Sequence, residues 1–412
     1  MLAKFLGAGD KKVLLSNFFS LLMLRGFQFL IPLITFPYLI RVIGIEKFGL
    51  VNFAFALSVF FGAVIQFGFG ITITREIARN RESSIRLVKI YSATMVSSAL
   101  LGLGCAVLFS IVVISVDRFN NELMLYALTF IYVAFQSLFP DWFFRGVEKM
   151  KYIALLSLGA NCLSLTGILL FVRQENDFLL VPLFNAIAAF FLYVVSIVLI
   201  RYKFHLEFEL PGLKEIGHVY RVGSHAFIAQ FTPNLYNNAA VFLLGLFQGP
   251  SVVGLYAAAT KVIDAVISIG YILASTFLPY LSRDIRKYGV FQKIMLYSGG
   301  VSTAIIFLFA EFISIHLFGS EYGEISNYIR LLAVAIFFGF TYLTYSSNYL
   351  MIVGHEVIAR NIALYISLAA LFYTAALIFS FGVYGAIASL LISRAALSCF
   401  SFLFYKRVGA EC

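Results

Sequence analysis

The feature that most constrains this chain is a series of twelve apolar runs, each long enough to cross a lipid bilayer as a helix. A soluble domain has about 25% charged residues, whereas this chain has 12%, with 61% hydrophobic residues. The sequence therefore predicts an all-α, polytopic membrane protein with twelve transmembrane helices. The runs lie near residues 13–40, 48–71, 90–116, 122–140, 152–172, 178–200, 224–247, 254–279, 294–317, 328–352, 361–380 and 383–405. The last two are separated only by residues 381–385, which predicts a tight hairpin.

Lysine and arginine residues collect in every second connection between these runs. Of the 30 cations, 22 fall on one side of the predicted membrane, five on the other, and three inside the runs. Because positively charged loops stay in the cytoplasm, both termini are expected on the cytoplasmic side. The formal net charge of +10 thus reflects topology and contact with anionic lipid headgroups, and a nucleic-acid partner is not expected.

The chain also shows weak internal self-similarity at an offset of 205 to 208 residues. The matching features are Gly44 with Gly249, residues 74–79 with residues 282–287, and Gly146 with Gly354. An offset of six spans keeps the orientation of the helices, so it predicts two six-helix bundles related by a pseudo-two-fold axis along the membrane normal.

The longest connection then divides the chain into two lobes. We expect an N-terminal lobe over residues 1–200, a cytoplasmic connection over 201–223 and a C-terminal lobe over 224–412. Two such bundles can rock about a cavity between them, which is alternating access. A duplication without this mechanism is the alternative.

Polar side chains form stripes on the first and seventh predicted spans. Arg25 and Gln28 share one face of the first span with Pro32, and prolines at positions 32 and 37 predict a kink there. On the seventh span a similar stripe contains Gln230, Asn234 and Asn237. Polar groups are costly in a bilayer, so these faces are expected to line protein or water.

Later spans carry isolated ionisable residues. On the eighth span Lys261 and Asp264 are spaced to pair across one helical turn; such a pair either lines a cavity or only fixes helix packing. Glu311 either pairs with a cation on another helix or takes up protons as part of a relay, and Arg394 serves either helix packing or substrate binding.

The balance of charges inside the spans is slightly cationic, with Arg25, Lys261 and Arg394 against Asp264 and Glu311. A cationic cavity suits an anionic substrate such as a phosphate or pyrophosphate. No nucleotide-binding, zinc or Ser-His-Asp pattern occurs in the sequence, and its four cysteines show no metal-ligand spacing. We therefore expect neither an enzyme nor a bound cofactor or metal.

Several connecting segments resemble the Wzx-type O-antigen flippases, also called RfbX-like polysaccharide transporters. The resemblance covers nearly the whole chain. It is most specific in residues 142–151 and 32–41, and it is also carried by residues 29–31, 67–70, 74–78 and 249–256. These flippases belong to the multidrug/oligosaccharidyl-lipid/polysaccharide exporter superfamily, so the resemblance implies twelve helices in two lobes around a central cavity.

The resemblance also implies a function. Such a protein carries undecaprenyl-pyrophosphate-linked oligosaccharide repeat units from the cytoplasmic to the periplasmic leaflet of the bacterial inner membrane, driven by an ion gradient. Family members are thought to bind the pyrophosphate through cavity cations, a role that Arg25 fits by position. A polysaccharide polymerase, a chain-length regulator and membrane lipids are the implied partners.

The predicted site combines these observations, and two other functions stay open. Substrate binding is assigned to Arg25, Gln28, Gln230, Asn234, Asn237, Lys261, Asp264 and Arg394, and ion coupling to Glu311 and Asp264. The first alternative is a multidrug or cation antiporter of the same superfamily, which would prefer an acidic cavity. The second is a non-transporting scaffold of a polysaccharide assembly complex.

Overall fold

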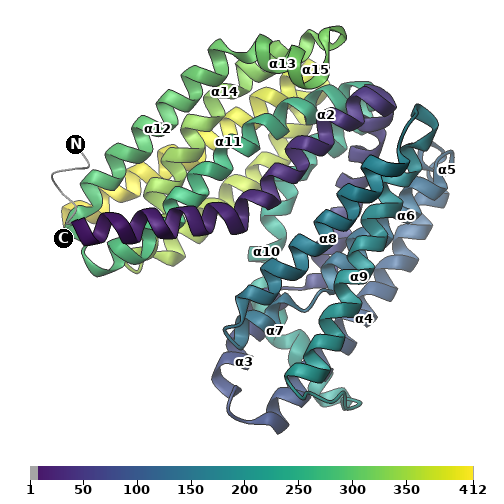
Figure 1. Cartoon of the computed structure of the whole chain (residues 1–412), viewed down its shortest axis with the longest axis vertical. Helices are drawn as coiled ribbons and strands as arrows, with labels where there is room; N and C mark the ends of the chain where they lie inside the picture. Colours follow the sequence, from purple (N-terminus) through teal and green to yellow (C-terminus); the bar gives the residue numbers. More distant parts are fainter. Residues whose placement is uncertain (1–7, 412) are drawn as a thin grey trace. The chain divides into compact units, whose positions relative to one another are not determined.

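The computed structural model describes residues 8–411, and in this range the chain forms helices and turns with no β-strand (Figure 1). Its side chains are described at residues 31–224, 226, 227, 231, 238–278 and 280–408. Long apolar sequences form helices in a membrane because only an intrahelical ladder satisfies every backbone group away from water. The all-α prediction is therefore confirmed over the described part of the chain.

Two of the helices each contain two of the predicted spans. Helix α2, Ala8–Gln66, is interrupted at Gly44 (φ 75°, ψ 164°), and α15, Glu356–Glu411, is interrupted at Gly382 (φ 56°, ψ −129°). Only glycine adopts such angles without strain. The described residues contain nine helical segments apolar and long enough to cross a membrane; with α10, Leu213–Phe247, and these two interruptions, they account for the twelve predicted spans.

The interruption at Gly382 is the predicted hairpin. The two halves of α15 are joined by a hydrogen bond of 2.6 Å between the hydroxyls of Tyr373 and Ser393, and by another between the hydroxyls of Thr374 and Ser389. These pairs lie on either side of the turn, so the halves run antiparallel.

The chain forms two compact units, Met1–Arg41 with Leu243–Cys412 and Val42–Phe242, which we call the C-terminal and the N-terminal unit. The first predicted span thus groups with the C-terminal half, and most of the seventh with the N-terminal half. The expected six-helix lobes at 1–200 and 224–412, with their connection at 201–223, stay a prediction.

The N-terminal unit consists mainly of helices that run side by side, as α6, α8 and α9 do (Figure 1). Besides the second half of α2 and most of α10, it contains α3, Phe69–Asn80; α4, Ser84–Ser115; α5, Asp117–Asn120; α6, Leu123–Leu138; α7, Asp141–Gly146; α8, Met150–Phe171; η1, Glu175–Leu179; and α9, Leu180–Lys203.

The C-terminal unit has a similar construction, in which α14 packs against α11 and α12 (Figure 1). Besides the first half of α2 and the whole of α15, it contains α11, Pro250–Arg283; η2, Ile285–Lys287; α12, Tyr288–Leu308; α13, Ala310–Phe318; η3, Ser320–Tyr322; α14, Glu324–Tyr342; and η4, a π-helical segment at Leu343–Leu350.

The internal repeat is visible in the backbone of the connections. Gly249 (φ 106°, ψ 170°) precedes α11 with nearly the conformation of Gly44. The turns that precede α8 and α15 also resemble each other. In each turn a backbone amide, that of Lys149 or of His355, donates over 2.8 Å to the carbonyl five residues earlier. These two turns lie 206 residues apart in the chain. The sequence pairs Gly146 with Gly354, an offset of 208, so the structural match differs from that pairing by two residues.

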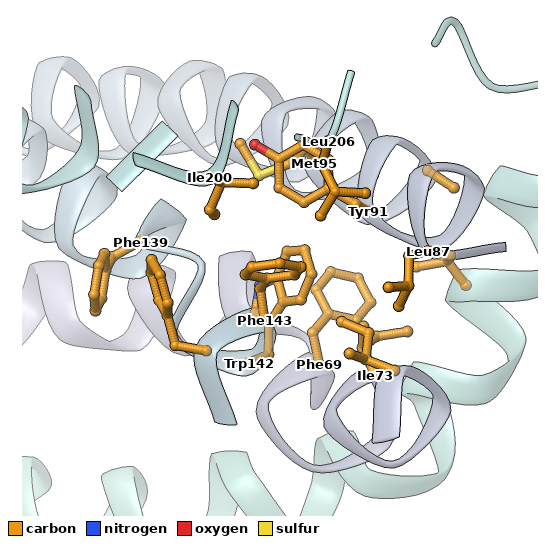
Figure 2. Packing of buried hydrophobic residues seen from close by; sticks show 14 of the residues in the cluster. Phe69, Ile73, Leu87, Tyr91, Met95, Phe139, Trp142, Phe143, Ile200 and Leu206 are labelled. Atoms are coloured by element: carbon orange, nitrogen blue, oxygen red, sulfur yellow. The ribbon is translucent and has the colours of Figure 1, made fainter. Parts of the chain in front are cut away.

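One hydrophobic core of the N-terminal unit lies where α3 and α7 meet α4 and α9 (Figure 2). Helix α3 contributes one face, with Phe69, Ile73 and Ile77 buried at spacings of four residues. Helix α7 contributes Trp142 and Phe143, which are 5% and 0% exposed. Each fully buried aromatic side chain of this kind stabilises the fold by about 1.5–3 kcal/mol.

A close backbone approach fixes the start of α3. Gly68 has φ 77°, and a Cβ atom there would lie 2.6 Å from the carbonyl oxygen of Gly223 on α10. The hydroxyl of Thr74 donates to the carbonyl of Trp142 over 3.3 Å, which ties α3 to α7. Two of the segments that carry the family resemblance therefore hold α3, α7 and α10 together.

Candidate functional site

The structure joins two of the predicted site residues within the C-terminal unit. Asp264 on α11 accepts a hydrogen bond from Arg394 on α15, with 2.8 Å between Oδ1 and Nη2. The side chain of Arg394 is 15% exposed and that of Asp264 is 54% exposed. The expected pairing of Asp264 with Lys261 along α11 is therefore corrected, because the carboxylate binds the guanidinium of another helix.

The guanidinium of Arg394 is only partly satisfied by this ion pair. Its Nη1 atom is buried and is one of four buried side-chain polar atoms without a hydrogen-bond partner among the described residues. An unsatisfied buried donor costs about 1–3 kcal/mol, and more when it is charged. A phosphate oxygen is an acceptor that would remove this cost, since arginine binds phosphate through two parallel N–H groups.

Lys261 lies one turn before Asp264 on α11 and contacts a different helix. Its Nζ atom lies 5.2 Å from the ring centroid of Phe36 in the first half of α2, a cation–π arrangement. Near Phe36, the hydroxyl of Thr35 donates to the carbonyl of Ile31 over 2.7 Å. Lys261 is half-buried.

These contacts define what we call the cationic cluster, made of Lys261, Asp264 and Arg394 with the ring of Phe36. The cluster contains two basic side chains and one carboxylate, so its formal net charge is positive. Two tyrosines of α11, at positions 256 and 271, lie within electrostatic range of the Asp264–Arg394 pair. Such a cluster can bind a phosphate-bearing anion, which would compete with Asp264 for Arg394.

Glu311 lies outside this cluster. It is in the first turn of α13, and its Oε2 atom accepts a hydrogen bond of 3.0 Å from Nη2 of Arg330 on α14. The two side chains are 66% and 37% exposed. Of the two alternatives raised for Glu311, the structure thus shows the pair with a cation of another helix. Its part in ion coupling stays a prediction.

The remaining predicted site residues lie outside the residues whose side chains are described. They are Arg25, Gln28, Gln230, Asn234 and Asn237. Their backbones belong to α2 and α10, as the sequence predicts, and their roles stay a prediction.

Sequence reasoning missed Phe36 as a site residue. The ring belongs to one of the segments that carry the resemblance, but its contact with Lys261 spans more than 200 residues. No periodic pattern indicates such a contact, because an apolar ring next to two prolines is equally typical of a lipid-facing position. The ion pair between Asp264 and Arg394 likewise could not be predicted from the spacing of residues along one helix.

Comparisons with known proteins agree with this architecture. The model of a family described as "Polysaccharide biosynthesis protein" matches residues 14–285. Two curated relatives are both named "Putative O-antigen transporter". The one from Shigella dysenteriae is 26% identical over 398 residues, which cover 93% of this chain and 98% of the relative. The one from Escherichia coli K12 is 24% identical over 276 residues, which cover 67% of this chain and 66% of the relative.

Solved structures share the fold at lower sequence identity. The lipid II flippase MurJ, in an inward closed conformation, superposes with a TM-score of 0.77 at 12% identity, over 94% of this chain and 87% of MurJ. A multidrug resistance MATE family transporter of the MOP superfamily, in an inward-facing conformation, gives a TM-score of 0.65 at 17% identity, over 92% of this chain and 95% of that one. The expected twelve-helix fold is confirmed.

Proposed function

The chain belongs to the polysaccharide biosynthesis protein family, and from this premise we propose that it is a flippase for lipid-linked polysaccharide units. Its cargo is an undecaprenyl-pyrophosphate-linked repeat unit of an O antigen or a related polysaccharide. The relatives named for O-antigen transport and the fold shared with a lipid II flippase support this assignment. The protein acts as a transporter and not as an enzyme.

The observation that carries the proposal is the cationic cluster. A pyrophosphate cannot cross hydrocarbon unaided, because charged groups lose their hydration there. Arg394 presents a buried, unsatisfied Nη1 atom, and Lys261 adds a second positive charge. When a phosphate oxygen binds these groups, charged hydrogen-bond donors replace the water molecules that it loses. The lipid offers no such donors.

The other predicted residues extend this picture. Arg25 is a further cation for the pyrophosphate, and Gln28, Gln230, Asn234 and Asn237 carry amides, which both donate to and accept from sugar hydroxyls. The polyprenyl tail stays in the surrounding lipid. The two lobes expose the cargo to each leaflet in turn by alternating access.

Ion coupling follows from the carboxylates. Asp264 and an anionic cargo would compete for Arg394, so we assign ion coupling to Asp264, the carboxylate in contact with the proposed pyrophosphate site. Glu311, which is paired with Arg330, is the second coupling carboxylate. We place the protein in the bacterial inner membrane with both termini in the cytoplasm, where its excess of cationic loops is expected. A polysaccharide polymerase and a chain-length regulator are its proposed partners.

Complementation of export tests the proposal. The chain is expressed in cells that lack their own O-antigen translocase and supply a chosen repeat unit, and surface polysaccharide is measured. We expect restored surface polysaccharide with at least one repeat unit. No restoration with any repeat unit, while the protein is present in the membrane, would contradict the flippase function. Resistance to cationic drugs in place of surface polysaccharide would favour the antiporter.

A further inference from the structure

The N-terminal unit contains a cavity of about 510 Å³ that none of the residues discussed above as substrate-binding or ion-coupling lines. It lies beside the core of Figure 2, with which it shares Phe69, Phe139 and Trp142. Its volume is within the range of small-molecule sites in proteins, about 300–1,000 Å³. The cavity can therefore take a compact chemical group.

The lining of this cavity is rich in neutral polar side chains. Amides and hydroxyls are contributed by Gln66, Gln136, Ser98, Ser137 and Ser157. An ion pair completes the polar lining, with 2.6 Å between Oδ2 of Asp141 and Nη2 of Arg145, one turn apart on α7. Each of these groups can exchange hydrogen bonds with hydroxyls of a ligand.

Helix α7 supports this lining rigidly. The amide of Asp141 donates to the carbonyl of Phe139 over 2.8 Å, and the carbonyl of Trp142 accepts a hydrogen bond from α3. Trp142, which lines the cavity, and its neighbours Phe143 and Phe144 are buried. A site whose side chains are held by packing keeps its geometry when it is empty, which lowers the cost of binding.

The lining of this cavity does not suit the pyrophosphate or the polyprenyl chain of the proposed cargo. Asp141 and Arg145 cancel, so the cavity has no net charge for a pyrophosphate, and the carboxylate would repel one. A polyprenyl chain would leave the amides and hydroxyls without partners.

Amides, hydroxyls, a charged pair and aromatic rings around one cavity match the chemistry of a sugar ring, which has many hydroxyls and apolar C–H faces. We propose that this cavity binds a sugar residue of the lipid-linked oligosaccharide. The inference rests on the proposed flippase function. It separates the recognition of the cargo into a pyrophosphate site at the cationic cluster and a sugar site in the N-terminal unit.

The single tryptophan of the chain gives a direct test. Because Trp142 lines the cavity, its fluorescence in purified protein reports on this site. One probe is undecaprenyl pyrophosphate without sugar, and the other is lipid-linked oligosaccharide extracted from the cells in which this chain is native. We expect the emission of Trp142 to change in a saturable way with the second probe only. An equal response to both probes, or no response to the oligosaccharide, would overturn the proposal.

Variants of the lining sharpen this test. We expect Gln136→Ala and Ser157→Ala each to weaken binding of the lipid-linked oligosaccharide by about tenfold, the loss of one or two hydrogen bonds, and to leave binding of undecaprenyl pyrophosphate unchanged. Gln248→Ala is the matched control, since Gln248 is an exposed glutamine of the C-terminal unit. Two variants are used because the amide of Gln136 also bonds Tyr132.

The outcomes separate this inference from the proposed function. If the chain restores export while both lining variants bind the oligosaccharide as tightly as the control, the sugar site is wrong and the flippase function stands. If the unaltered chain exports no repeat unit, the proposed flippase function is contradicted, whatever the lining variants show. Weaker binding of both probes to the lining variants would also count against the proposal, because it would show that the cavity serves the pyrophosphate.

Discussion

Arg394 is the residue on which the proposed chemistry depends most. It has one nitrogen bound to Asp264 and another buried without a partner, while most arginines in protein interiors have their donors satisfied. A guanidinium arranged in this way stabilises the fold less than it could. We interpret the missing hydrogen bond as the place that a phosphate oxygen of the cargo takes.

Substitution of Asp264 and Arg394 by neutral residues tests whether this ion pair binds the cargo or only stabilises the fold. Asp264→Asn leaves a buried cation unpaired and should lower the free energy of unfolding by on the order of 1–3 kcal/mol, and Arg394→Gln by less, because Asp264 is half exposed. The double variant removes both charges and should regain stability. Thermal unfolding in detergent measures these changes.

Export by the double variant then decides the role of the pair. We expect surface polysaccharide to be lost although the protein is stable, because the cation that binds the pyrophosphate is gone. Export at the wild-type level would show that the pair only stabilises the fold of the C-terminal unit.

Arg25 offers a second residue-scale prediction, independent of Arg394. Arg25→Ala should abolish export, and Arg25→Lys should retain part of it, because a mobile pyrophosphate needs charge more than the fork geometry of a guanidinium. Surface polysaccharide is compared at equal protein levels in the membrane. Normal export by Arg25→Ala would remove this residue from the site.

At the scale of elements, short helices do much to organise the N-terminal unit. Helix α3 has only 12 residues, yet it contacts both α4 and α7. The polar contacts of α10 with α3 and α4 include 2.7 Å between His218 and Glu76 and a 3.0 Å bond from Tyr220 to the carbonyl of Ser97. The first turns of α10 are therefore fastened to α3 and α4.

Substitution of Gly68 tests how much this junction contributes. Gly68→Ala requires a left-handed conformation with a side chain and places Cβ against the carbonyl of Gly223, so it should lower stability by more than about 1 kcal/mol. Gly104→Ala in α4 is the matched control, because its Cβ would meet nothing within 4 Å. The midpoints of thermal unfolding should fall for the first variant and hold or rise for the second. Equal midpoints would contradict the importance of the junction.

The elements also show what sequence patterns can predict. The twelve spans and the hairpin at Gly382 follow from local apolar length and from glycine, so they were predictable. The pairing of Asp264 was not, since α11 offers Lys261 at a suitable helical spacing, whereas Arg394, which lies 2.8 Å from the carboxylate, belongs to a helix far along the chain. The cavity beside Trp142 was missed for the same reason, because its lining comes from seven different helices.

At the scale of the whole molecule, charge asymmetry and helix number together predict the topology. The sequence predicts cytoplasmic termini from 22 cations against five, and an even number of spans places both ends on one side. The two units have related turns at Gly44 and Gly249, as expected for a duplicated bundle. The membership of the first span in the C-terminal unit was not predictable, because chain order alone assigns it to the N-terminal half.

Reporter fusions test this orientation. A fusion of alkaline phosphatase after Gln174 should be active, since the enzyme folds only outside the cytoplasm, and a fusion after Lys149 should be inactive. Green fluorescent protein at the same two positions should give the opposite pattern. Activity of the phosphatase at Lys149 would reverse the proposed topology.

The most direct test of the central claim is translocation by the purified protein. The chain is reconstituted into liposomes with lipid-linked oligosaccharide in the inner leaflet, and the appearance of glycan outside is followed with an impermeant glycosidase or lectin. We predict translocation that depends on an imposed ion gradient and is lost in the stable Asp264→Asn, Arg394→Gln double variant. Glycan that stays inside with the unaltered protein, or that emerges equally with the double variant, would contradict the account.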